Sequence, residues 1–136
     1  MAKILYLEDS EMLRTQMADL LRCAGYDVDE AATIAKAEQK YAASRPDVVL
    51  SDYSLRGELG TAFLRNLRNK GETVPALLLS GTDLSDIEAA NPDFKMLDVT
   101  YLSKGLNTRE VIAAIKSTLP PEIRQVGLTQ PAIRTV

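Results

Sequence analysis

The sequence has no histidine, only one cysteine and no long apolar run. Without histidine the chain lacks the commonest general base and the commonest metal ligand, and it cannot carry a phosphohistidine of its own. The single cysteine, Cys23, excludes a disulfide within the chain and a metal cluster built on thiolates. Because Leu20, Leu21 and Ala24 surround it in the sequence, we expect Cys23 to be a buried or half-buried filler.

Membrane-directed and nucleic-acid-binding features are also scarce. The first residues have neither a long apolar core nor a cleavage pattern, so we expect no signal peptide, no membrane insertion and a cytoplasmic location. The net charge is -3, and the lysines and arginines do not gather into a footprint that could track phosphates. Direct contact with nucleic acid is therefore not expected.

A chain of 136 residues, of which 46% are hydrophobic, has the size of one compact domain. Its composition changes near the end, because residues 120–136 contain three prolines and few large apolar side chains. We expect a domain over residues 1–119, followed by a C-terminal tail or linker over residues 120–136.

Five short apolar runs alternate with five segments of helical periodicity. This alternation is typical of a doubly wound α/β domain, in which helices cover both faces of a five-stranded parallel sheet. The second run is the most polar, so we expect it at an edge of the sheet. The expected strands lie at 4–7, 26–31, 48–50, 74–79 and 99–103.

Capping residues mark the ends of the expected helices. Ser10 and Thr33 are suited to cap the first two helices, and Asn107 or Thr108 is suited to cap the last. Gly25 is placed to end the first helix. The expected helices begin near residues 11, 34, 61, 85 and 108, and the fourth is short because Asn91-Pro92 interrupts it.

Polar side chains stand where four of the five expected strands end. Glu8 and Asp9 follow the first strand, Asp52 the third, Ser80 the fourth and Lys104 the fifth. Since parallel strands end at one edge of a sheet, these side chains should converge there. Two carboxylates about 4 Å apart repel by roughly 4 kcal/mol at an effective dielectric constant near 20, so positive charge is needed. Lys104 supplies one charge, and Mg²⁺ is the natural further partner.

Such a pocket suits phosphoryl transfer. A carboxylate oxygen of Asp52 could attack phosphorus in line, while Lys104 and Mg²⁺ offset the charge on the phosphoryl oxygens and the Ser80 hydroxyl donates to another oxygen. An aspartyl phosphate would be the product.

Over residues 2–119 the sequence resembles the response-regulator receiver domain of two-component signalling, the CheY-like family. That family has an acidic pair after its first strand, a phosphoacceptor aspartate after its third, a Ser or Thr with a small residue after its fourth and a lysine after its fifth. It also has a glycine eight residues beyond the acceptor. The matching residues are Glu8-Asp9, Asp52, Ser80-Gly81, Lys104 and Gly60. The resemblance implies a flavodoxin-like (βα)5 fold with strand order 2-1-3-4-5.

The resemblance also implies roles for individual residues. Asp52 would be the phosphoacceptor, and Mg²⁺ would bind Asp9, Asp52 and the backbone carbonyl of Ser54, with Glu8 helping through water. Ser54 and Thr82 correspond to positions that tune how fast the phosphoryl group is hydrolysed.

A conformational switch is implied as well, in which Ser80 is paired with the aromatic residue Tyr101, three residues before the lysine. Such a domain takes its phosphoryl group from a phosphohistidine of a sensor histidine kinase or a phosphotransfer protein. It then controls a downstream protein target and slowly loses the phosphoryl group again. It acts as a switch, not as a conventional enzyme, and it can form a homodimer.

Three departures from the family pattern surround this motif. Arg56 stands where the family usually has proline, four residues beyond the acceptor, and Gly105 replaces the usual proline after Lys104. Leu97-Asp98 replaces the usual Gly-Ala. We therefore expect the face formed by the fourth helix and fifth strand to differ from that of other receivers.

Three other functions fit parts of the sequence. A pseudo-receiver would bind a partner without phosphorylation. A phosphohydrolase of the aspartyl-phosphate type would usually carry a second aspartate two residues after its nucleophile, and that residue is Ser54 here. A nucleotide- or flavin-binding protein would need a glycine-rich phosphate loop after the first strand, where Glu8 and Asp9 would repel phosphate.

Overall fold

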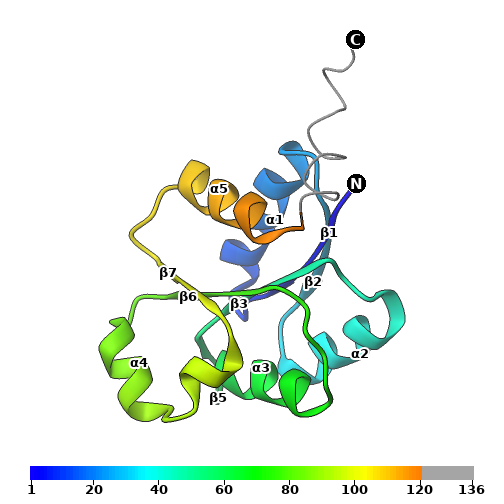
Figure 1. Ribbon diagram of the computed structural model, residues 1–136. Coiled ribbons are helices and arrows are strands. Elements are labelled where there is room, and N and C mark those ends of the chain that lie inside the picture. Colours follow the sequence, from blue (N-terminus) through cyan, green and yellow to red (C-terminus); the bar gives the residue numbers. More distant parts are fainter. Residues whose placement is uncertain (121–136) are drawn as a thin grey trace.

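Five parallel strands form the central sheet of the computed structural model, which describes residues 1–120 (Figure 1). These strands are β1 (Lys3–Leu7), β2 (Asp27–Ala31), β3 (Val48–Asp52), β6 (Ala76–Ser80) and β7 (Thr100–Ser103). Their order is β2-β1-β3-β6-β7, with β2 at an edge, so the predicted order and edge strand are confirmed. Residues 121–136, which make up nearly all of the predicted tail or linker, lie outside the described residues.

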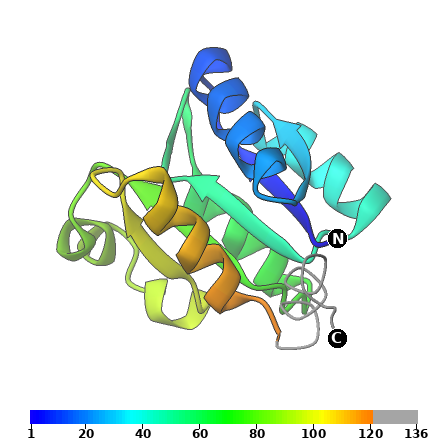
Figure 2. The same cartoon turned by 90° about the horizontal axis from the view of Figure 1, so that it is seen from above.

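Helices cover both faces of this sheet (Figures 1 and 2). The helices are α1 (Glu11–Cys23), α2 (Ile34–Ser44), α3 (Gly60–Asn69), α4 (Leu84–Ala90) and α5 (Thr108–Thr118), with a 3-10 turn η1 (Phe94–Leu97). One face carries α1 and α5, and the other carries α2, α3 and α4 (Figure 1). The doubly wound α/β architecture is therefore as predicted.

The core consists of two apolar layers, one on each face of the sheet. In β1, Ile4 and Tyr6 pack in the layer beneath α1 and α5, whereas Leu5 and Leu7 pack in the layer on the other face. All residues of β3 and β6 are buried, as is typical of the central strands of a parallel sheet. Packing on both faces holds the ends of these strands in fixed positions.

The predicted caps form. The side-chain oxygen of Ser10 accepts a hydrogen bond from the Leu13 N–H at 3.3 Å, and that of Thr33 accepts from the Lys36 N–H at 3.1 Å. Asn107, not Thr108, caps α5, and it does so reciprocally with Glu110.

Two local features differ from the sequence prediction. The segment between the third and fourth expected strands was expected to contain only a helix, but a hairpin of β4 (Ser54–Leu55) and β5 (Glu58–Leu59) precedes that helix. Cys23 is exposed, so the expectation of a buried filler was wrong. At 3.6 residues per turn, Cys23 is rotated by about 200° from the buried Leu21 and thus faces solvent.

The peptide between Lys104 and Gly105 is trans.

Within residues 1–120, the structure contains no helix with both the length and the apolar character needed to cross a membrane.

We predict that Gly60→Ala destabilises the domain by about 1–3 kcal/mol, because a Cβ at Gly60 would overlap the carbonyl oxygen of Asp52. In an unobstructed helix the same change would stabilise, so the sign of the effect is diagnostic. Urea denaturation of Gly60→Ala and of Gly81→Ala, whose Cβ would meet nothing within 4 Å, provides the measurement and its control. Equal stabilities of the two variants would contradict the prediction.

Candidate functional site

The side chains expected to converge meet at the edge of the sheet where the strands end. Asp52 is the last residue of β3 and is 2% exposed, and Glu8 directly follows β1 and is 3% exposed. Ser80, the last residue of β6, is also buried. Asp9 and Lys104 lie further out, so the pocket is open to solvent on their side.

Three carboxylates form a tight cluster in this pocket. Glu8, Asp9 and Asp52 can each offer one oxygen so that all three oxygens lie within 4.8 Å of one another. Burial raises the pKa of Glu8 to about 7 and the negative charge of Asp52 adds to the effect, although a hydrogen bond from the Ser10 N–H opposes it. Burial also raises the pKa of Asp52. Holding these groups ionised is therefore costly.

Lys104 partly compensates this negative charge. Its Nζ lies 3.0 Å from Oδ1 of Asp52 and 3.9 Å from Oε1 of Glu8, and it counteracts the rise in the Asp52 pKa. Its backbone N–H donates to the Ser80 carbonyl at 2.8 Å, which ties the lysine to the neighbouring strand. Even so, within residues 1–120 the buried Oδ1 of Asp52 accepts no well-aligned hydrogen bond.

This donor set fits a hard divalent cation. Three carboxylates with oxygens within 4.8 Å of one another, and an open side for water, are conditions under which Mg²⁺ binds. Ser54, the first residue of β4, is exposed two positions beyond Asp52. Its role as a carbonyl ligand stays a prediction.

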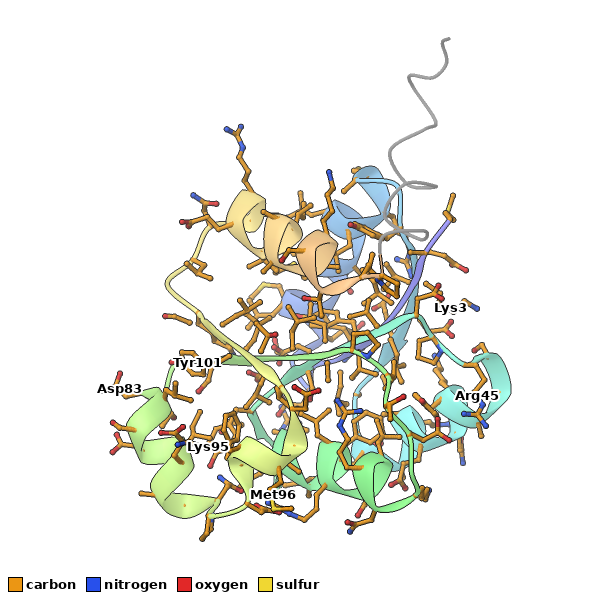
Figure 3. The ribbon with its side chains drawn as sticks, viewed as in Figure 1. Lys3, Arg45, Asp83, Lys95, Met96 and Tyr101 are labelled. Atoms are coloured by element: carbon orange, nitrogen blue, oxygen red, sulfur yellow. The ribbon has the colours of Figure 1, made fainter. Side chains whose placement is uncertain are left out.

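Ser80 and Tyr101 share a hydrogen-bond partner, Thr82. The Ser80 hydroxyl donates to the Thr82 carbonyl at 3.1 Å and accepts from the Thr82 N–H at 2.8 Å. The half-buried Tyr101 donates its hydroxyl to the same carbonyl at 2.8 Å (Figure 3). One backbone carbonyl therefore connects the two residues expected to form the switch.

Sequence reasoning missed two residues of the pocket. The guanidinium of Arg56 lies beside one of the acids, with Nε 3.9 Å from Oδ2 of Asp9. Tyr6 is buried beneath the pocket, and the loss of hydration together with the charges of Glu8 and Asp52 raises the pKa of its hydroxyl. Arg56 stood out in the sequence only as an unusual loop residue, and the apolar run of β1 concealed Tyr6.

Curated relatives of this chain carry regulatory names. It is 31% identical over 142 residues to the alkaline phosphatase synthesis transcriptional regulatory protein SphR of Synechococcus elongatus, covering 98% of this chain and 54% of SphR. It is 32% identical over 117 residues to the transcriptional regulatory protein BasR of Escherichia coli, covering 86% of this chain and 52% of BasR. The chain thus spans about half the length of the curated relatives it matches.

Solved structures share the fold. The chemotaxis protein CheY4 of Vibrio cholerae superimposes with a TM-score of 0.78 at 27% identity, covering 88% of this chain and 99% of CheY4. The receiver domain of the hybrid histidine kinase CckA superimposes with a TM-score of 0.70 at 28% identity, covering 87% of this chain and 99% of that domain.

The family model of the response regulator receiver domain matches residues 4–116. This range runs from β1 to α5 and so includes every strand that ends at the acid pocket. The chain belongs to the response regulator receiver domain family.

Proposed function

We propose that Asp52 accepts a phosphoryl group from a phosphohistidine on a sensor histidine kinase or a phosphotransfer protein. The single observation that carries this proposal is the placement of Asp52, buried between Lys104 at 3.0 Å and the carboxylates of Glu8 and Asp9. Glu8 is the other buried carboxylate of this cluster, and it lies further from Lys104, at 3.9 Å.

The transfer step needs few parts. An oxygen of Asp52 attacks phosphorus, the O–P bond forms as the P–N bond to imidazole breaks, and the imidazole nitrogen keeps the electron pair and takes up a proton. Lys104 neutralises charge on a phosphoryl oxygen, and Ser80 donates its hydroxyl to another. Asp9, Asp52 and the Ser54 carbonyl would hold Mg²⁺, with Glu8 acting through water, and the ion would supply further positive charge to the phosphoryl oxygens.

Phosphorylation then acts as a switch. When the Ser80 hydroxyl turns to the phosphoryl group, its two hydrogen bonds with Thr82 are lost and the loop after β6 is free to shift. Tyr101, bonded to the same Thr82 carbonyl, follows that shift, so the state of Asp52 reaches the surface beside α4. The phosphoryl group is later hydrolysed, at a rate tuned by Ser54 and Thr82.

The partners follow from this cycle. The switch controls a downstream protein target in the cytoplasm, and a homodimer is a second candidate output. A pseudo-receiver, which binds its partner without phosphorylation, is the alternative, and it would bind that partner with equal affinity after Asp52→Ala.

We predict that incubation with Mg²⁺ and a small acyl phosphate adds one phosphoryl group to the protein, as measured by intact mass. Asp52→Asn should gain none, because an amide oxygen is a far weaker nucleophile than a carboxylate. Asp47→Asn serves as the matched control and should react like the wild type. Asp47 directly precedes β3, so its carboxyl group lies at the end of the strand opposite to Asp52. Equal labelling of wild type and Asp52→Asn would refute the proposal.

We predict that Lys104→Gln slows phosphorylation by about 100-fold, because a preorganised positive charge near the transferring group is lost. Lys95→Gln, which removes an exposed charge on η1, should leave the rate unchanged (Figure 3). The initial rate of mass gain at a fixed acyl phosphate concentration distinguishes the two variants. A rate for Lys104→Gln within twofold of wild type would exclude this role.

We predict that without divalent cations the free energy of unfolding falls as the pH rises from about 4.5 to about 7. The folded protein holds a proton on Glu8 up to about pH 7, whereas the unfolded chain releases it near its ordinary pKa of 4.5. Folding therefore takes up protons in this interval, and one proton corresponds to a slope of about 1.4 kcal/mol per pH unit at most.

Glu8→Gln should flatten this pH dependence, and saturating Mg²⁺ should stabilise the wild type more at pH 7.5 than at pH 5. Urea denaturation across this range provides the measurement. A pH profile that Glu8→Gln leaves unaltered would show that another group carries the effect.

A further inference from the structure

The hairpin that follows Asp52 is held at several points. Its strands β4 and β5 pair antiparallel, and its turn consists of Arg56 and Gly57, with Gly57 at a φ of 76° that other residues rarely adopt. A carboxylate oxygen of Glu58 accepts a hydrogen bond from the Ile34 N–H at the start of α2, at 3.1 Å. The Gly60 N–H donates to the Tyr53 carbonyl at 2.7 Å and closes the base of the hairpin. Arg56 therefore projects from a fixed turn.

Arg56 and Lys104 approach different members of the acid cluster. Its Nε lies 3.9 Å from Oδ2 of Asp9, while the Nζ of Lys104 approaches Asp52 and Glu8. The Arg56 side chain is 87% exposed, so it fills no part of the core and its removal leaves no cavity. Its contribution within the described part of the chain is thus its charge beside Asp9.

We propose that Arg56 weakens the binding of a divalent cation at Asp9, and so sets the cation concentration at which the pocket fills. This inference rests on the proposed function, in which Asp9 is a cation ligand. The guanidinium pairs with the Asp9 carboxylate when no cation is present and repels a cation that arrives at the same carboxylate. Both effects act against cation binding.

The size of the effect follows from the exposure of the pair. Solvent-exposed ion pairs contribute little free energy, which corresponds to about a two- to fivefold change in a dissociation constant. The effect is also screened by salt, because the Debye length falls from about 10 Å at 0.1 M to about 3 Å at 1 M ionic strength. Salt dependence therefore separates the charge of Arg56 from any mechanical role in the hairpin.

Isothermal titration calorimetry with MgCl₂ tests the proposal on the full chain. We expect Arg56→Gln to lower the dissociation constant for Mg²⁺ about two- to fivefold at low salt, and this gain should shrink towards zero at about 1 M KCl. Arg56→Lys should bind like the wild type because it keeps the charge. Lys116→Gln, which removes an exposed positive charge from the last turn of α5, should also bind like the wild type.

The outcomes distinguish failure of this inference from failure of the proposed function. Equal affinities of wild type and Arg56→Gln at low salt, weaker binding by Arg56→Gln or the same gain in Lys116→Gln would overturn the inference and leave the cation site intact. A gain that persists at high salt would assign the effect to hairpin geometry and overturn it too. If none of the four proteins binds Mg²⁺, both the cation site of the proposed function and the inference fall.

Discussion

The contact between Lys104 and Asp52 is the interaction on which the acid pocket depends. Three carboxylate oxygens within 4.8 Å of one another would drive the strand ends apart or take up protons if no positive charge stood beside them. The lysine lies 3.0 Å from Asp52, and its backbone is hydrogen bonded to the adjacent strand. Because the strands are packed on both faces, the cluster cannot relax by moving apart. The fold thus holds a repulsive arrangement that a divalent cation can relieve.

Helix α3 connects this pocket to the opposite side of the domain. Its first residue, Gly60, packs against the backbone of Asp52. Two arginines further along the helix, Arg65 and Arg68, contact the segment between α4 and β7. Arg65 binds Asp93 through two hydrogen bonds of 2.6 and 2.9 Å, and Arg68 donates to the Leu97 carbonyl at 2.7 Å. The short α4 and the turn η1 are therefore held to α3 by side chains, while the loop after β6 is held mainly by the hydrogen bonds around Thr82.

Most of the fold could be predicted from the sequence, because buried parallel strands give unbroken apolar runs and helices carry caps such as Ser10 and Thr33. The convergence of the acids followed from the parallel sheet alone. Other features leave no local pattern. The strands β4 and β5 have two residues each, too few for any periodicity, and the approach of Arg56 to Asp9 joins residues that are distant in the sequence. Such contacts are set by how the loops pack, which neither propensity nor spacing reveals.

The charges around the pocket also explain why an arginine is tolerated at the turn of the hairpin. Glu8, Asp9 and Asp52 bring three negative charges when ionised, and Lys104 and Arg56 bring two positive ones, so one negative charge remains and attracts a cation. In the proposed function, a divalent cation would reverse this balance to one positive charge, which would favour the approach of a phosphoryl group. Since an aspartyl phosphate carries about two negative charges in place of one, its formation brings the pocket close to neutrality. With Arg56 absent, the cation-loaded pocket would be neutral and would lack this attraction for the donor.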